Sequence, residues 1–218
     1  MIMKKQKSDL FPLCFSIAAV AAFVLVLAIP GSREVFKTMT AAHPFVMGFV
    51  KFAFLATVGE LIAIRLQKKR WLLPVGIFAK FIVWGLFGIV IALMFKIFAG
   101  GVGLLLANSI LPGEGIALWS AFLTSLLMNS SFGIALMSSH RVTDTMIVLA
   151  CEKKKISVEN IVSSIDFKAL IGFTIGKTIP LFWIPAHTIT FSLPGEYQMV
   201  VAAFLSIVLG IFLSLKKN

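Results

Sequence analysis

The feature that most constrains this chain is a series of uninterrupted apolar runs, such as "FPLCFSIAAVAAFVLVLAIP" over residues 11–30. An α-helix needs about 20 consecutive apolar residues to cross the hydrocarbon core of a bilayer. Membrane-spanning β-strands would instead read as segments of about ten residues with alternating hydrophobicity. Because backbone polar groups in lipid must be paired internally, the continuous runs predict an all-α integral membrane protein.

Composition supports the same class. Hydrophobic residues make up 59% of the 218 residues and charged residues only 13%, whereas soluble domains carry roughly 25% charged residues. A chain this apolar has too little polar surface to cover a soluble fold. No linker or repeat divides the sequence, so we expect one transmembrane domain over residues 1–218.

The apolar runs predict a bundle of six transmembrane helices. A retained helix is favoured over a cleavable signal peptide for the first run, because signal peptides have apolar regions of about 7–15 residues. The predicted spans are Phe11–Pro30, Pro44–Leu66, Leu72–Lys96, Ile116–Ser138, Ala169–Leu193 and Tyr197–Leu215.

Basic residues predict the orientation, since short cytoplasmic loops are enriched in Lys and Arg. With six spans, fourteen of the twenty Lys and Arg residues fall on the side that holds both termini. Both termini are therefore expected in the cytoplasm. No Arg-rich, Ser-rich transit sequence precedes the first run, which favours a bacterial plasma (inner) membrane over the alternative, an organelle membrane.

Two connections are longer than turns. Residues 97–115 lack basic residues and are expected on the outer face as an interfacial or re-entrant element. Residues 141–165 are expected to form two short helices on the inner face. Asp144 and Ser157 are candidate N-caps for these helices, because their side-chain oxygens can accept hydrogen bonds from free N–H groups.

The sequence offers little for catalysis, and the protein is expected not to be an enzyme. No glycine-rich nucleotide motif is present, and the histidines (His43, His140 and His187) have no metal-ligand neighbours at helical spacing. We expect no cofactor, no metal site and no disulfide between Cys14 and Cys151. The net charge of +11 is explained by the basic cytoplasmic loops, so no nucleic-acid partner is expected.

Polar residues inside the predicted spans are the candidate functional site, since charges in the membrane are costly and usually functional. Counted from the predicted helix ends, they lie about 9–13 Å from the inner face. Glu60 and Lys51 are on opposite faces of one helix, so Glu60 should pair with Lys80 or Lys177. Lys51 and Lys96 are expected to reach the outer interface. The four residues of the predicted layer are Glu60, Lys80, Asn129 and Lys177.

This layer has two interpretations. It can be a dry ion pair with polar helix contacts, which are common between membrane helices. It can also line a hydrated path, because one acid facing two lysines leaves a positive charge that attracts water or an anion.

Prolines and hydroxyl residues interrupt the fifth predicted span, which we expect to be kinked at Pro180 and Pro185. The sequence W-I-P-A-H…T-F-S-L-P-G-E-Y-Q…L-S resembles the C-terminal signature of the Mpv-seventeen / peroxisomal membrane protein twenty-two family. "TVGEL" at 57–61 is similar to that family's G-D pair, and the looser resemblance begins at His43. The residues that carry the signature are Trp183, Pro185, His187, Phe191, Pro194 and Tyr197.

The resemblance implies a divergent member of this family of small multi-pass membrane proteins, with residues 1–30 as an added N-terminal helix before a core over 43–218. Some family members are credited with channel-like passage of small solutes. We therefore expect a channel or facilitator for an unidentified small solute or ion, in contact with the lipid bilayer. The alternative is a structural or scaffolding membrane protein. Small residues in the last two spans also allow a homo-oligomer.

Overall fold

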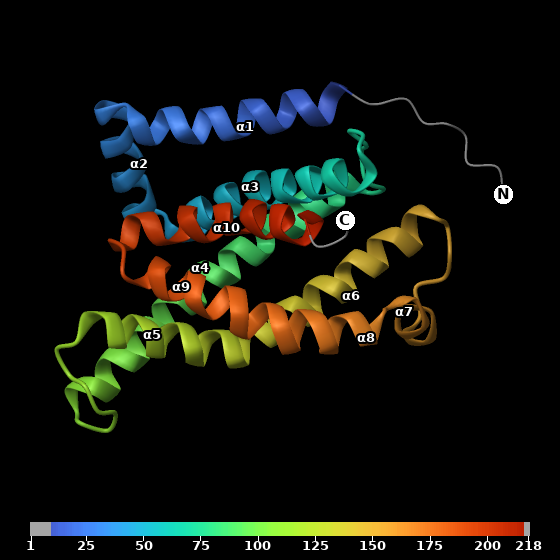
Figure 1. Ribbon diagram of the computed structural model, residues 1–218. Coiled ribbons are helices and arrows are strands. Elements are labelled where there is room, and N and C mark those ends of the chain that lie inside the picture. Colours follow the sequence, from blue (N-terminus) through green and yellow to red (C-terminus); the bar gives the residue numbers. More distant parts are fainter. Residues whose placement is uncertain (1–9, 216–218) are drawn as a thin grey trace.

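The computed structural model describes residues 10–215, and within this range all regular structure is helical (Figure 1). The helices are α1 (Leu10–Ala28), α2 (Pro30–Ala42), α3 (Pro44–Lys68), α4 (Ile77–Ala107), α5 (Ala117–Met128), η1 (Asn129–Gly133), α6 (Ile134–Cys151), α7 (Val158–Ser164), α8 (Phe167–Ala169), η2 (Leu170–Trp183), α9 (Ile184–Phe191) and α10 (Gly195–Leu215). The segments η1 and η2 are π-helical.

Five helices are long and apolar enough to cross a membrane. They are α1, α3, α4, the continuous helix Ala117–Cys151 and the continuous helix Phe167–Phe191. The helix α10 is also apolar, from Gly195 to Ile211, and lies beside α3. Successive long helices run in opposite directions (Figure 1). The predicted class, an all-helical multi-pass membrane protein, is thus confirmed at this level.

Both long connections begin later in the chain than predicted. The helix α4 continues to Ala107, so the connection expected at 97–115 begins eleven residues later than predicted. The fourth helix likewise continues past Ser138 to Cys151. As a result Asp144 lies inside a helix and is not an N-cap. The other predicted cap is confirmed, because the Ser157 side chain accepts a hydrogen bond from the Asn160 N–H.

The helix α2 was not predicted. It begins with Pro30, whose fixed φ suits a first helical turn. It lies across one end of the bundle, between α1 and α3 (Figure 1), and turns Phe36 and Thr40 inward. The covering helix therefore buries a part of α3 that the sequence analysis assigned to the membrane interface.

The proline-rich helix is continuous from Phe167 to Phe191. Around Pro180 the backbone takes the wider π-helical winding of η2, and Pro185 falls in the first turn of α9. Wider winding is a common response to a proline ring inside a helix. Thr178 and Thr188 donate hydrogen bonds to backbone carbonyls of their own helix. The prolines thus change the winding and do not interrupt the helix.

The centre of the bundle is α3, which packs against α4 on one side and α10 on the other. The backbones of α3 and α4 meet at Gly48 and Gly88, where a Cβ on Gly88 would collide with the Gly48 carbonyl. Close helix crossings in membranes commonly use such small residues. The crossing sets the register of α3 against α4, and so the height at which their polar side chains meet.

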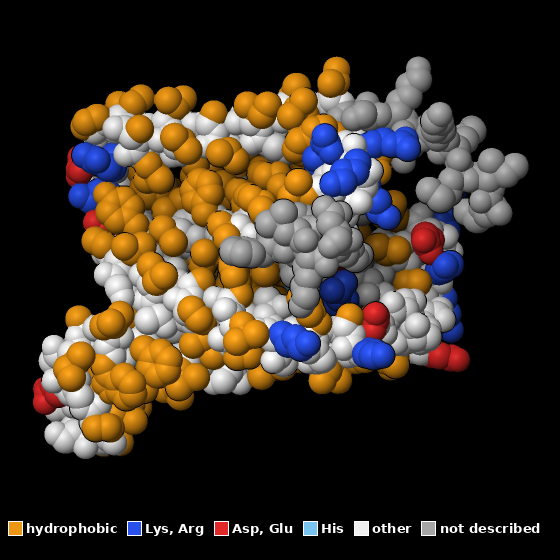
Figure 2. Space-filling model, in the orientation of Figure 1, with side chains coloured by type: hydrophobic (Ala, Val, Ile, Leu, Met, Phe, Trp, Pro, Cys, Tyr) orange, Lys and Arg blue, Asp and Glu red, His pale blue; other side chains and the backbone are white. Residues whose placement is uncertain are grey.

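One end of the molecule is rich in basic residues (Figure 2). We call it the basic end; it carries the connection after α3 and residues 152–157, with Lys68, Lys69, Arg70 and Lys153–Lys155. The opposite end carries α2 and the connection between α4 and α5 (Figure 1). Between the two ends the surface is mostly hydrophobic (Figure 2), as a protein surrounded by lipid requires.

Candidate functional site

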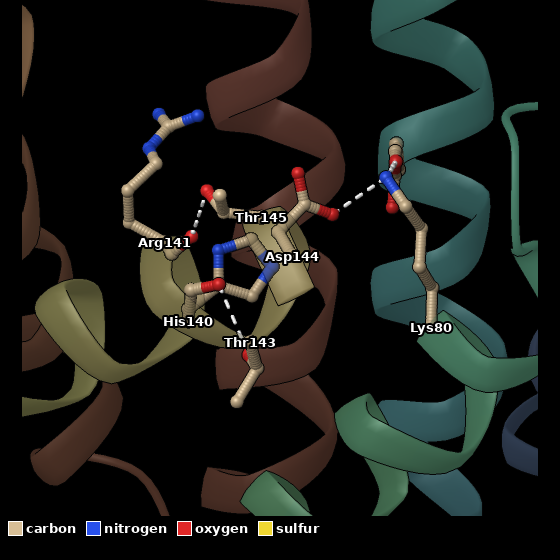
Figure 3. Close-up of polar contacts among 7 residues, drawn as sticks. Lys80, His140, Arg141, Thr143, Asp144 and Thr145 are labelled. Carbon is tan, nitrogen blue, oxygen red and sulfur yellow. Dashed lines mark hydrogen bonds and ion pairs between the residues drawn. The ribbon is translucent and has the colours of Figure 1, made fainter. Parts of the chain in front are cut away.

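A buried lysine near the basic end is held by two carboxylates. Lys80 Nζ on α4 lies 2.6 Å from Glu60 Oε1 on α3 and 2.6 Å from Asp144 Oδ1 on α6. Figure 3 shows Asp144 pointing from its helix toward Lys80. These contacts bring together three helices that are distant in the sequence, so the lysine ties the α3–α4 hairpin to α6.

Helical spacing creates this contact. Lys80 and Trp84 are four residues apart on α4, and His140 and Asp144 are four residues apart on α6, so each pair shares one helix face. The two faces meet, because the Trp84 and His140 rings lie 4.3 Å apart at 33°. The ion pair between Lys80 and Asp144 therefore lies next to the contact between the Trp84 and His140 rings. We call these residues the charged cluster: Glu60, Lys80, Trp84, His140 and Asp144.

The charged cluster is compact and carries an excess of negative charge. The Lys80 side chain is 9% exposed, and the Glu60 and Asp144 side chains are 23% and 24% exposed. One lysine and two acids give a formal charge of −1, the opposite of the surplus expected from the sequence. The hollow beside the cluster leaves no room for a water-sized sphere. The cluster is closed, and a solute could pass only if its helices moved apart.

A second polar group lies on α5, η1 and α9, and its hydrogen bonds fix the direction of each donor. Ser125 Oγ donates to the Ile184 carbonyl at 2.7 Å, and Asn129 Nδ2 donates to the Ser125 carbonyl at 2.8 Å. The Asn129 Oδ1 atom therefore faces His187 Nδ1, at 3.1 Å. Because an amide oxygen only accepts hydrogen bonds, His187 Nδ1 must be the donor.

Aromatic rings surround the second group. The Trp183 ring stacks on His187 at 5.2 Å and 26°, and Phe95 from α4 meets the same imidazole edge-on at 5.7 Å. Phe95 also contacts Phe191, with ring centroids 4.8 Å apart. We call this set the neutral cluster: Phe95, Ser125, Asn129, Trp183 and His187. It joins α4 to the helices α5 and α9 without any Asp, Glu, Lys or Arg.

The two clusters lie at different heights. Trp84 and Phe95 are eleven residues apart on α4, and Asn129 and His140 are eleven residues apart on the continuous helix of α5 and α6. At 1.5 Å per residue both intervals correspond to about 16 Å. The single polar layer predicted from the sequence is therefore wrong, because the structure separates its members into two levels.

Two of the four predicted site residues meet. Glu60 pairs with Lys80, one of the two partners expected for it. Lys177 is exposed on η2 and belongs to neither cluster. The direction of its side chain could not be derived from its depth alone, since depth says nothing about which face of a helix a residue occupies.

Asn129 belongs to the neutral cluster, although its predicted depth matched that of Glu60. The depth was counted from Ser138, whereas the helix ends at Cys151. The error of thirteen residues moves the reference point by about 20 Å at the helical rise.

His140 and Asp144 were not among the predicted site residues, because both were expected outside the membrane-spanning part of the helix. Their spacing of four residues was the available signal, since a histidine and an acid at i, i+4 share one face. A continuous helix through Ser138 would have carried both residues into the bundle and offered Lys80 a second carboxylate.

Lys51 was expected to reach the outer interface, and the structure contradicts this. Its side chain is fully buried, its Nζ donates to Thr40 Oγ1 at 2.9 Å, and it lies 4.3 Å from the Phe36 ring centroid. Thr40 and Phe36 both come from α2. Lys51 therefore contacts a hydroxyl group and an aromatic ring of the covering helix, and not the membrane interface. Lys96, the other lysine expected at the interface, is exposed.

The family-motif residues take positions around the neutral cluster and the turn that follows it. Trp183 and His187 are members of the cluster, and Phe191 contacts Phe95. Pro194 lies in the short turn between α9 and α10, and its carbonyl accepts a hydrogen bond from the Tyr197 N–H at 3.0 Å. The short connection between the fifth and sixth predicted spans, Ala169–Leu193 and Tyr197–Leu215, is thus present in the structure.

Within residues 10–215, no group of three or more His, Cys, Asp or Glu side chains is arranged to hold a metal ion. Comparison with known families, curated proteins and solved structures found no match for this chain. The geometry of the two clusters therefore supplies the observations from which a function can be inferred.

Proposed function

We propose that the protein is a facilitator for small solutes, with six spans, both termini in the cytoplasm and a path that the charged cluster closes. The observation that carries this proposal is Lys80, which is buried between carboxylates of two other helices. Each charged side chain in a membrane-spanning helix raises the free energy of membrane insertion. An intramembrane lysine that contacts two acids is therefore a functional-site hypothesis by default.

The charges favour a cationic solute. Glu60 and Asp144 compete for one ammonium group, so a second cation near them would find a carboxylate oxygen that Lys80 cannot fully neutralise. Such a cation would weaken the hold of Lys80 on α3 or α6 and loosen the contact between these helices. Rings of acidic side chains select cations in channels by the same electrostatic attraction.

The sequence resemblance supports passage of small solutes. The similar family includes members credited with channel-like activity, and the most similar stretch, residues 182–214, contributes Trp183 and His187 to the neutral cluster. The basic end agrees with a cytoplasmic location under the positive-inside rule. A bacterial inner membrane remains the proposed location.

A scaffolding protein is the second candidate, and one observation favours it. The charged cluster leaves no room for a water-sized sphere, as expected of an ion pair that only holds helices together. In that case Lys80 is a structural tie between the α3–α4 hairpin and α6, and no solute ever reaches it.

Flux through purified protein in liposomes tests the proposal. Potassium, proton, chloride and glycerol fluxes are measured for the native protein, Asp144→Asn and Glu34→Gln. Glu34 is the matched control, because it is an exposed acid on α2. We expect cation flux above that of protein-free liposomes. Asp144→Asn should raise the rate, because Lys80 loses one partner, and lower the preference for cations over chloride.

Two results would contradict the facilitator. One is flux equal to that of protein-free liposomes for every solute; the other is an equal effect of Glu34→Gln. Thiol labelling separates the candidates further, in a background with Cys14→Ala and Cys151→Ala. Thr143→Cys beside the charged cluster should react with a water-soluble thiol reagent, and the exposed apolar position Ile171→Cys should not. A scaffold leaves both unreactive.

A further inference from the structure

A second, apolar cavity lies on the other side of the α3–α4 hairpin from α6. Its volume is about 300 Å³, at the lower end of the range of ligand-binding pockets. It shares no lining residue with the charged cluster. The lining residues come from α1, α3 and α4: Phe11, Phe15, Phe54, Thr57, Leu61, Ile77, Phe78 and Phe81.

Aromatic rings dominate the wall. Phe15 stacks on Phe54 with centroids 5.9 Å apart and an angle of 15°, and Phe54 meets Phe81 edge-on at 5.0 Å. Phe11 and Phe78 are exposed, at 58% and 76%, so the rim of the cavity faces the lipid. A molecule dissolved in the bilayer can enter from the side.

One lining residue has an unused hydrogen-bonding group. Thr57 is 2% exposed, and its Oγ1 atom has no hydrogen-bond partner. Other buried helical threonines of this protein avoid that cost by donating to the carbonyl four residues earlier, as Thr124 and Thr190 do at 2.8 and 2.9 Å. A buried hydroxyl without a partner is destabilising, because it has lost its hydrogen bonds to water. Thr57 therefore lacks the usual structural explanation.

We propose that this cavity binds a lipid-soluble ring compound with a hydrogen-bond-accepting oxygen, of the chemical class of the membrane quinones. The phenylalanine rings match a flat aromatic ring, since aromatic pairs favour stacked and edge-on contacts. The Thr57 hydroxyl donates to the ring oxygen. A helical threonine has two accessible χ1 rotamers, which direct the hydroxyl differently and let it meet the ligand.

An acyl chain of a phospholipid fits the same apolar wall less well. It carries no polar atom along its length, so it would leave the Thr57 hydroxyl unpaired in a dry cavity. A quinone ring satisfies that hydroxyl and also fills the space between the phenylalanine rings. The oxygen of the ligand is therefore the feature that distinguishes the proposed occupant.

The experiment compares two probes that differ in that oxygen. Nanodiscs with the full-length protein are equilibrated by dialysis against empty nanodiscs with either 2,3-dimethyl-1,4-naphthoquinone or 2,3-dimethylnaphthalene. The quinone has no free ring position for a nearby thiol to attack. Its excess in the protein nanodiscs should saturate at about one molecule per chain.

The variants then assign the site. Thr57→Val keeps the shape and removes the hydroxyl, so quinone affinity should fall about 5- to 10-fold, the worth of one hydrogen bond. The affinity for the hydrocarbon should not change. Thr124→Val, at an equally buried threonine on α5, should change neither affinity. Thermal unfolding of Thr57→Val should match or exceed that of the native protein, which excludes misfolding.

Three results would overturn the proposal. They are no quinone excess over empty nanodiscs, equal losses of both probes on Thr57→Val, and equal effects of Thr57→Val and Thr124→Val. Equal losses of both probes would identify an apolar groove for lipid chains. The test is independent of the facilitator, because it uses no flux measurement and no residue of the charged cluster.

Discussion

The charged cluster and the neutral cluster both connect α4 to the continuous helix Ala117–Cys151, but by different physics. The charged cluster also holds α3, whereas the neutral cluster also holds η2 and α9, and the two clusters lie at levels about 16 Å apart along the helix axes. The charged cluster uses ion pairs with one lysine. The neutral cluster uses a directed chain of hydrogen bonds surrounded by rings.

The two clusters differ in how readily their contacts can be exchanged. Ion pairs are non-directional, so another cation or water can take the place of the Lys80 ammonium beside the carboxylates. The hydrogen bonds of the neutral cluster each have one donor direction, and that cluster holds no charge that could be exchanged. The charged cluster is therefore suited to opening, and the neutral cluster to serving as a fixed pivot. Helices that move apart at one level while held at another would expose a path at the basic end.

Removing the lysine should have the largest effect. Lys80→Met leaves two carboxylates facing each other with little water, and loss of one partner of a buried ion pair typically costs about 3–5 kcal/mol. We expect about 3 kcal/mol, because both acids keep partial exposure, measured as a lower unfolding temperature in detergent. The control is Lys96→Met, an exposed lysine on the same helix. A comparable loss there would mean that general charge matters more than the cluster.

The second-largest loss of stability is expected from forcing α3 and α4 apart. Gly88 lies on α4 between the two clusters, and an added Cβ would collide with the Gly48 carbonyl. Overpacking typically costs about 1–3 kcal/mol, so we expect Gly88→Ala to lower stability by about 2 kcal/mol. Gly100→Ala on the same helix meets open space and should be neutral or stabilising. Equal unfolding temperatures for the two variants would contradict the close crossing.

Breaking the neutral chain should cost slightly less. Asn129→Leu removes the acceptor of His187 Nδ1 and leaves a buried donor unpaired, at about 1–3 kcal/mol. A double-variant cycle measures this contact. His187→Phe should cost less in the Asn129→Leu background than alone, because the shared hydrogen bond is already lost. Additive losses would show that the two side chains act separately.

Replacing an indole should have the smallest effect. Trp183 in the neutral cluster buries an Nε1–H without a hydrogen-bond partner. Trp183→Phe removes this unpaired donor and some apolar area, so the two contributions oppose each other, and we expect a change below about 1 kcal/mol in the unfolding free energy. A loss above about 2 kcal/mol would show that this indole N–H is paired in the membrane.

The class of fold could be predicted from the sequence because the length of each apolar run matches the thickness of a membrane. It could not predict the ends of the long helices, since neither "FAGGVGLLLA" nor the stretch after Ser138 contains a proline that would end a helix. Depths measured from wrong ends then mixed the two clusters into one layer. Within the site, the Glu60–Lys80 contact was predictable from charge, but the contact of Asp144 was not, while Asp144 was assigned to a separate short helix outside the membrane.

The burial of Lys51 shows a different limit. Nothing in the apolar pattern distinguishes a lysine that reaches the interface from one covered by another helix. That distinction depends on α2, whose mixed sequence "PGSREVFKTMTAA" resembles neither a span nor a turn. Amphipathic connecting helices are therefore the elements most easily missed in a chain dominated by apolar spans.

The position of α2 over Lys51 also has a consequence for biogenesis. As α3 leaves the translocon, its lysine needs a contact that stabilises its charge before lipid surrounds it, and Thr40 and Phe36 precede it by 11 and 15 residues in the chain. The nascent segment from α1 to α3 thus supplies the hydroxyl and the aromatic ring that stabilise this charge. We expect these three helices to integrate as one unit, with the remaining spans added to a hairpin that is already stable in the bilayer.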